Sequence, residues 1–225
     1  MRLVLLSGLG ADGRLFREID CPGVELVTPP HLEPFEGEAL SAYARRVAER
    51  WGLAPEDAVG GASFGGMVAA EIESHRPAAA LVLIGSSVSP RSIAAPLALI
   101  ERASRAVADA AVRYAFRIDP RVVALVESLP PANRALLMEM FRATPLAVLR
   151  RGAAMIFRWT GASPRCAIHR IHGDRDRIIG ARPTEVDVLV PGGGHLLPFS
   201  HPREVSAFIG RTLGGGGAAR TPNSQ

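Results

Sequence analysis

Short apolar runs alternate with helical patterns over the first 85 residues of the chain. Four runs have the length of buried strands and end at turn-forming or polar residues. They are Leu3–Leu6, Val24–Val27, Ala58–Ala62 and Ala80–Ile84. Between Glu36 and Trp51 apolar residues recur at spacings of three and four, and a second helical stretch follows the third run and ends before Pro77. This alternation predicts an α/β fold, in which helices cover both faces of a mainly parallel sheet.

The pattern changes over residues 89–158, where no segment has the composition of a good strand. We expect three or four helices there. Prolines mark the breaks between them, near Pro120, Pro130-Pro131 and Pro145. Such a segment is a helical subdomain with its own small core or a lid over the edge of the sheet, and the two interpretations are compatible. We predict a helical lid insertion over about residues 89–160.

Strands return after this segment. Runs at Cys166–Ile171 and Val186–Val190 predict two more, which gives about six strands in all. A final helix is expected from Pro202 to Leu213, and the glycine-rich and polar residues 214–225 are predicted to be a disordered tail. We interpret residues 1–213 as one domain that carries the lid as an insertion.

Composition narrows the class of protein. The chain has 225 residues, of which 48% are hydrophobic, enough for the core of one domain. Its net charge is +4 and its isoelectric point is about 10.0, because all 26 basic residues are arginine. The arginines are scattered and accompany few aromatic residues, which disfavours nucleic-acid binding. Together with the abundant alanine, they are typical of a bacterial chain encoded by a GC-rich genome.

Export and membrane insertion are not predicted. The N-terminal apolar run stops at Ser7, which is too short for a signal peptide, and no stretch approaches the ~18–20 apolar residues of a membrane helix. Cys21 and Cys166 fit neither a disulfide framework nor the spacing of metal ligands. We expect a cytoplasmic protein that binds no membrane and no metal.

Ser63 stands in Gly61-Ala62-Ser63-Phe64-Gly65, between a predicted strand and a predicted helix. The Gly-x-Ser-x-Gly pattern alone is weak, since about 0.1–0.2 matches are expected by chance in such a chain. Its position strengthens it, because a sharp strand–turn–helix junction exposes the serine hydroxyl. We predict that Ser63 is a nucleophile. The alternative is a tight turn with an incidental serine.

A serine nucleophile needs a general base, and the base needs an acid to orient it. His195 is the best candidate base, since it follows the last predicted strand in a glycine-rich loop. His31 follows the second strand and could contact substrate. The remaining histidines have structural explanations or share a strand on opposite faces. They are His75, His169, His172 and His201.

Two aspartates follow the strand predicted at Cys166–Ile171, in the segment His172-Gly173-Asp174-Arg175-Asp176. Asp176 is further from the strand end and better placed to turn inward along the loop, so it is the preferred acid. Asp174 is interpreted as a residue that stabilises the turn.

Four segments together resemble the α/β-hydrolase superfamily over essentially residues 1–213. They are Ser7-Gly8-Leu9-Gly10, Gly61–Gly66, Gly173–Asp176 and Gly194-His195. The reactive residues come in that family's chain order of Ser, Asp and His. The chain is most similar to small bacterial esterase-like members with a helical lid. The resemblance implies Ser63 as nucleophile, Asp176 as acid, His195 as base, and an oxyanion hole formed by the backbone N–H groups of Leu9 and Phe64.

Two features depart from the family pattern. The first predicted strand starts at the beginning of the sequence, so about six strands are expected in place of eight. Only Arg177–Glu185 separates the acid loop from the last strand, which predicts that the helix usual at this point is shortened or missing.

The resemblance implies a serine hydrolase that cleaves an ester of a small or medium apolar substrate through an acyl-enzyme, without metal or organic cofactor. The first alternative is a thioesterase or acyltransferase, whose acyl-carrier phosphates Arg150 and Arg151 could meet. A lyase of the same fold and a binding module without chemistry are the others. The expected partner is a small molecule, and the chain is expected to act as a monomer or homodimer.

Overall fold

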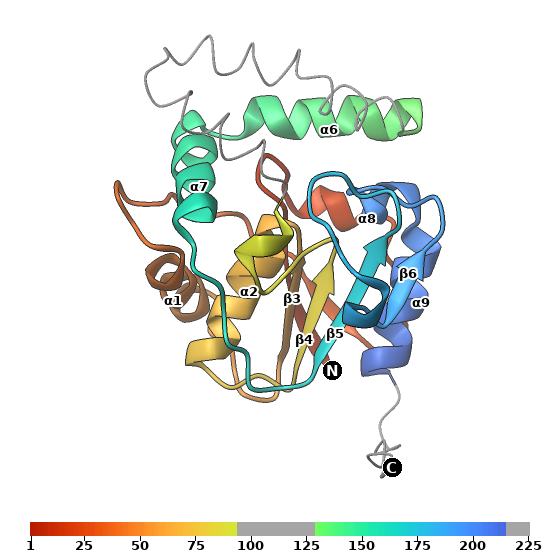
Figure 1. The fold of residues 1–225 in the computed structure, drawn as a ribbon, viewed down its shortest axis with the longest axis horizontal. Helices are drawn as coiled ribbons and strands as arrows, with labels where there is room; N and C mark the ends of the chain where they lie inside the picture. The colour runs from red at the N-terminus through yellow and green to blue at the C-terminus, as the bar shows by residue number, and fades with distance from the viewer. Residues whose placement is uncertain (94–128, 215–225) are drawn as a thin grey trace.

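Six strands form one sheet in the order β2-β1-β3-β4-β5-β6 (Figure 1). The computed structural model describes residues 1–93 and 129–214, and neighbouring strands of this sheet all pair in parallel. The strands are β1 (Arg2–Leu6), β2 (Glu25–Val27), β3 (Ala58–Ala62), β4 (Ala80–Ile84), β5 (Ile168–Gly173) and β6 (Val188–Val190). The predicted parallel α/β fold with about six strands is confirmed.

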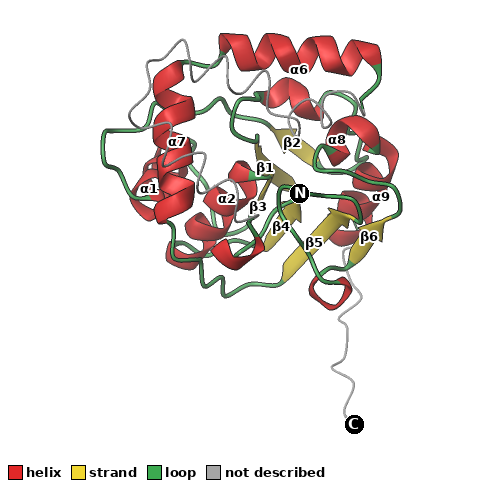
Figure 2. Ribbon diagram, turned by 45° about the horizontal axis from the view of Figure 1, so that its top comes forward, coloured by secondary structure: helices red, strands yellow, loops and turns green. Residues whose placement is uncertain are grey.

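Helices cover both faces of the sheet (Figure 2). On one face, α1 (Leu40–Arg50) and α2 (Phe64–His75) share a buried cluster with strand residues such as Val59. On the other face, α9 (Pro202–Leu213) and the short α8 (Leu197–Ser200) pack with strand residues such as Val82. Both sides of the central strands are therefore buried, which is why they read as continuous apolar runs.

Two further helices lie across the end of the sheet toward which the strand arrows point (Figure 1). They are α6 (Pro131–Ala143) and α7 (Leu146–Arg158), and each begins at a predicted proline break. The break predicted near Pro120, most of the earlier part of the lid and the tail after Gly214 lie outside the described residues. The lid over residues 89–160 thus stays a prediction. None of the helices that the structure describes is long and apolar enough to cross a membrane.

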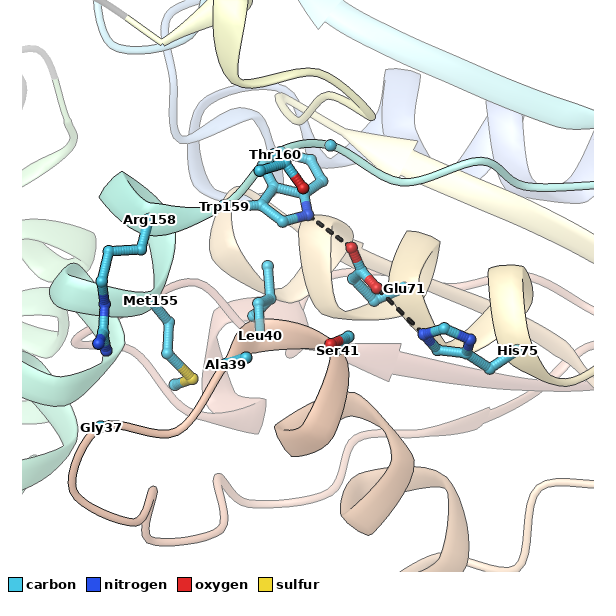
Figure 3. A pocket seen from close by; sticks show the side chains of 11 residues that line it. Gly37, Ala39, Leu40, Ser41, Glu71, His75, Met155, Arg158, Trp159 and Thr160 are labelled. Carbon is cyan, nitrogen blue, oxygen red and sulfur yellow. Dashed lines mark hydrogen bonds and ion pairs between the residues drawn. The ribbon is translucent and has the colours of Figure 1, made fainter.

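A buried carboxylate ties the end of α7 to α2. The Nε1–H of Trp159 donates to Glu71 Oε1 at 2.6 Å, and His75 Nε2 lies 3.4 Å from Glu71 Oε2 (Figure 3). These three side chains line a crevice of about 290 Å³. A carboxylate removed from water needs such donors, because burial without them is costly.

Replacing Trp159 by phenylalanine is expected to lower the free energy of unfolding by about 2–3 kcal/mol, since Glu71 loses its shortest hydrogen bond while a smaller aromatic ring stays in place. Trp51→Phe is the matched control, because the Nε1 of Trp51 has no hydrogen-bond partner among residues 1–93 and 129–214. Urea unfolding followed by circular dichroism measures both variants. Equal losses would show that ring volume, and not the hydrogen bond to Glu71, sets the cost.

Candidate active site

Ser63 occupies a strained turn between β3 and α2. Its backbone angles are φ 51° and ψ −120°, and it is the one non-glycine residue with positive φ in the described ranges. Ser86 lies just after β4, and its Oγ–H donates to the Ser63 carbonyl at 2.7 Å. A Cβ on Gly61 would collide with the backbone of the same junction, and a Cβ on Gly65 would collide with the backbone at the end of β1. Glycine neighbours and the bond from Ser86 thus permit and hold a turn that exposes the serine side chain.

Gly65→Ala should lower the free energy of unfolding by about 2–3 kcal/mol, because its Cβ would overlap the carbonyl oxygens of Leu6 and Ser7, which cannot swing aside as a side chain can. Gly210→Ala in α9 is the control. Nothing lies within 4 Å of the Cβ position of Gly210. That change should be neutral or stabilise the protein by up to about 1 kcal/mol. Thermal unfolding compares the two variants. An unchanged melting temperature for Gly65→Ala would contradict the close approach of Gly65 to the backbone of Leu6 and Ser7.

The imidazole of His195 connects Ser63 to Asp176. His195 follows β6 and is 8% exposed; its Nε2 lies 2.9 Å from Ser63 Oγ and its Nδ1 lies 2.8 Å from Asp176 Oδ2. An ionised carboxylate only accepts hydrogen bonds, so Nδ1 carries the proton and Nε2 is free to accept the serine O–H. The structure brings together the three residues proposed from the sequence as nucleophile, base and acid.

The carboxylate of Asp176 is surrounded by donors, and its side chain is 1% exposed. The backbone N–H groups of Ile178 and Ile179 donate to Oδ1 at 2.8 and 3.0 Å, while the imidazoles of His195 and His172 approach Oδ2 at 2.8 and 3.1 Å. Burial raises the pKa of Asp176, but the two histidines and the amide of Ile179 together hold it well below its ordinary value. Asp176 is therefore ionised at neutral pH, as the proton on His195 Nδ1 requires.

The competing aspartate, Asp174, makes a different contact. It is exposed, and its Oδ1 accepts the backbone N–H of Gly192 at 2.7 Å, which joins the two loops that carry Asp176 and His195. This contact fits the turn-stabilising role expected for Asp174. The connection that follows Asp176 contains a single 3-10 turn, Pro183–Glu185, so the helix at this point is shortened as the sequence predicts.

The two amides predicted to form the oxyanion hole are near Ser63. Phe64 follows Ser63 directly, and a Cβ built on Gly8, the neighbour of Leu9, would lie 3.4 Å from the Ser63 Cβ. Neither the Leu9 nor the Phe64 N–H donates to any residue within the described part of the chain. An oxyanion hole needs such uncommitted donors. The assignment of Leu9 and Phe64 stays a prediction that this arrangement supports.

Three side chains whose roles the sequence did not predict support the site. His31 Nε2 lies 3.1 Å from both Ser7 Oγ and the Gly8 carbonyl, so His31 braces the loop that carries Leu9, in place of the substrate contact considered for it. Burial lowers the pKa of His31, which favours a neutral ring there. The other two are Ser86, behind Ser63, and His172, beside Asp176. Their positions at or just beyond strand ends are the only signal in the sequence, and they form no motif.

Helices α6 and α7 pack on the loop that contains Leu9. The side chain of Leu9 fills the space that a Cβ on Gly152 would need, and Phe141 lies against Gly10. In α7, Arg151 Nη1–H donates to the Pro34 carbonyl at 2.7 Å and lies 3.2 Å from a Glu33 carboxylate oxygen. Because its guanidinium is engaged there, Arg151 is less suited to meet the phosphates of an acyl carrier.

Metal ligation finds no support in the residues that the structure describes. No group of three or more His, Cys, Asp or Glu side chains in those ranges could hold a metal ion, and Cys21 and Cys166 are both free thiols.

Comparison with known proteins identifies the family to which the chain belongs. A model of the α/β hydrolase family matches residues 3–208, whereas no curated protein matches the chain. The chain resembles a thermophilic esterase from Thermogutta terrifontis, with a TM-score of 0.73 and 18% identity over 95% of this chain and 89% of that one. A thioesterase of the prodiginine pathway of Streptomyces coelicolor gives a TM-score of 0.62 with 21% identity, over 95% and 90% of the two chains. An epoxide hydrolase from metagenomes of hot environments gives 0.61 with 14% identity, over 94% and 90%. The chain belongs to the α/β hydrolase family.

Proposed function

We propose that the protein is a serine hydrolase that cleaves an ester bond of a small or medium apolar substrate through an acyl-enzyme. The observation that carries this proposal is the hydrogen-bonded series from Ser63 Oγ to His195 and from His195 to Asp176, with distances of 2.9 and 2.8 Å. A nucleophile, a base that can take its proton and an acid that orients the base are what acyl transfer to serine requires.

The reaction has two halves. In the first, His195 Nε2 takes the proton of Ser63 Oγ as the oxygen attacks the ester carbonyl carbon, and the amides of Leu9 and Phe64 stabilise the oxyanion. The imidazolium, stabilised by Asp176, then gives its proton to the leaving alcohol as the C–O bond breaks. In the second half, His195 takes a proton from the water that attacks the acyl carbon, and it returns this proton to Ser63 Oγ as the bond between Oγ and the acyl carbon breaks and the acid leaves.

A serine nucleophile favours acyl transfer over the opening of an epoxide, although one structural neighbour is an epoxide hydrolase. Attack of Ser63 on a carbonyl gives an ester, whose carbonyl carbon water can attack in turn. Attack on an epoxide carbon would give an ether, which has no carbonyl and no easy route back to free serine. The chemistry of the oxygen at position 63 therefore supports substrates with a carbonyl group.

Active-site labelling combined with a substrate panel tests the proposal. A fluorophosphonate probe should modify Ser63, identified by peptide mass spectrometry, and p-nitrophenyl acetate and butyrate should be hydrolysed faster than the matching acyl-CoA thioesters. Faster turnover of the thioesters would indicate the thioesterase alternative. Labelling without turnover of either class would indicate a lyase, and absence of labelling would indicate a binding module.

A further inference from the structure

A second histidine reaches the carboxylate of Asp176. His172 lies near the end of β5 and is fully buried, with Nε2 at 2.7 Å from the Ile179 carbonyl oxygen and 3.1 Å from Asp176 Oδ2. Its other ring nitrogen, Nδ1, is buried without a hydrogen-bond partner among residues 1–93 and 129–214. The ring thus has all its polar contacts on the side of the acid loop.

These contacts determine which nitrogen of His172 carries the proton. A carbonyl oxygen only accepts hydrogen bonds, so the short contact with Ile179 requires a proton on Nε2. The same N–H points toward Asp176 Oδ2, which also accepts. A proton on Nδ1 would place a buried donor where the described residues offer no acceptor, which is costly. His172 is therefore a neutral donor shared between the carbonyl and the carboxylate.

Backbone hydrogen bonds hold the course of the acid loop, but the orientation of the Asp176 carboxylate depends on the donors that surround it. The segment after Asp176 has one 3-10 turn where related chains are expected to have a longer helix. Backbone bonds from Ile178 and Ile179 occupy Oδ1 of Asp176, and they leave Oδ2 to the two imidazoles. With donors on both oxygens the carboxylate cannot rotate about its Cβ–Cγ bond without losing several hydrogen bonds at once.

We propose that His172 is a positioning residue: it joins β5 to the short acid loop and fixes Oδ2 of Asp176 in line with Nδ1 of His195. It does not touch substrate and acts only through Asp176. The inference rests on the proposed function of Ser63, His195 and Asp176, and adds to it a residue that neither the sequence pattern nor the family resemblance indicates.

Charged and titratable groups reach the surroundings of His172 from several elements. Asp176 and His195 approach from the loops after β5 and β6. Arg170 lies on the same face of β5, where its Nε–H donates to the Ser86 carbonyl at 2.7 Å and its Nη1 lies 3.8 Å from Glu185. The side chains introduced at position 172 should therefore be uncharged. The electric field at Asp176 then changes only through the hydrogen-bond donor that is kept or removed.

Methionine and glutamine form a matched pair for the test, since they have similar length and differ in the terminal amide donor. With p-nitrophenyl butyrate, His172→Met is expected to lower kcat by about 10–100-fold with little change in KM, the size of effect seen when a residue that orients a metal ligand is lost. His172→Gln should restore most of kcat. His169→Met, on the opposite face of β5, should behave as wild type. Thermal unfolding of each variant allows rates to be expressed per folded molecule.

Proton NMR supplies a readout that does not depend on turnover. The low-field resonance of His195 Nδ1–H should shift or broaden in His172→Met and be retained in His172→Gln. Nitrogen shifts in the wild-type protein should show that His172 carries its proton on Nε2. A proton on Nδ1, an unaltered resonance and kcat in His172→Met, or equal losses in the Met and Gln variants would each overturn the inference. Failure of the proposed function is separate, since it would appear in the wild type as absent labelling and turnover while the NMR result still decides the role of His172.

Discussion

Replacing Ser63 by alanine is expected to lower kcat by about 10⁵-fold or more while the protein stays folded. Without Oγ no acyl-enzyme can form, and His195 and the two amides can at most assist a slow attack by water. The fold should tolerate the change, because Ser86 donates to the backbone carbonyl of residue 63 and not to its side chain. Alanine at φ 51° is strained in the same way as serine, so the turn is neither relieved nor newly stressed.

Steady-state hydrolysis of p-nitrophenyl butyrate measures the loss, and circular dichroism checks the fold. Ser163→Ala is a suitable control, because Ser163 is exposed and lies on the connection between α7 and β5. If the Ser63→Ala protein kept the wild-type rate, Ser63 would not be the nucleophile and the proposed function would fail at its first step.

The strands show how far a hydrophobic pattern predicts a fold. β3 and β4 have the predicted bounds, because both are buried on both faces and end at abrupt changes of composition. β6 was expected from Val186 but begins at Val188, since its register pairs it only with Ile171–Gly173 of β5. Strand ends at the edge of a sheet depend on how far the neighbour extends, which the pattern of one segment does not contain.

The residues of the candidate site also fall into those that the sequence pattern predicts and those that it does not. Ser63, Asp176 and His195 could be predicted because each follows a strand, and the carboxyl ends of parallel strands meet at one edge of the sheet. Ser86 and His172 could not, because their roles come from contacts between β4, β5 and loops whose course depends on the order of the strands. His31 was noticed as a residue beyond β2, but its direction toward Gly8 was not foreseeable from spacing.

Asp176→Asn is expected to lower kcat by about 10³–10⁴-fold, because the ring proton of His195 moves from Nδ1 to Nε2. The amides of Ile178 and Ile179 both donate to Oδ1, so the oxygen of the asparagine side chain should stay with them. Its NH₂ group then replaces Oδ2 and faces Nδ1 of His195. Two donors cannot pair, so Nδ1 must lose its proton and Nε2 must carry one. A protonated Nε2 in a neutral ring cannot accept the proton of Ser63.

Asp174→Asn is the matched comparison, since it makes the same chemical change two residues away. Asp174 offers Oδ1 to the N–H of Gly192, and asparagine keeps an oxygen for that bond, so the rate should fall by no more than about 2-fold. Values of kcat for both variants, measured with the same ester, decide which aspartate is the acid. A large loss in Asp174→Asn beside a small one in Asp176→Asn would assign the role to Asp174. Such a result would also mean that the loop rearranges when substrate binds, because of the two aspartates only Asp176 contacts His195 in the described part of the structure.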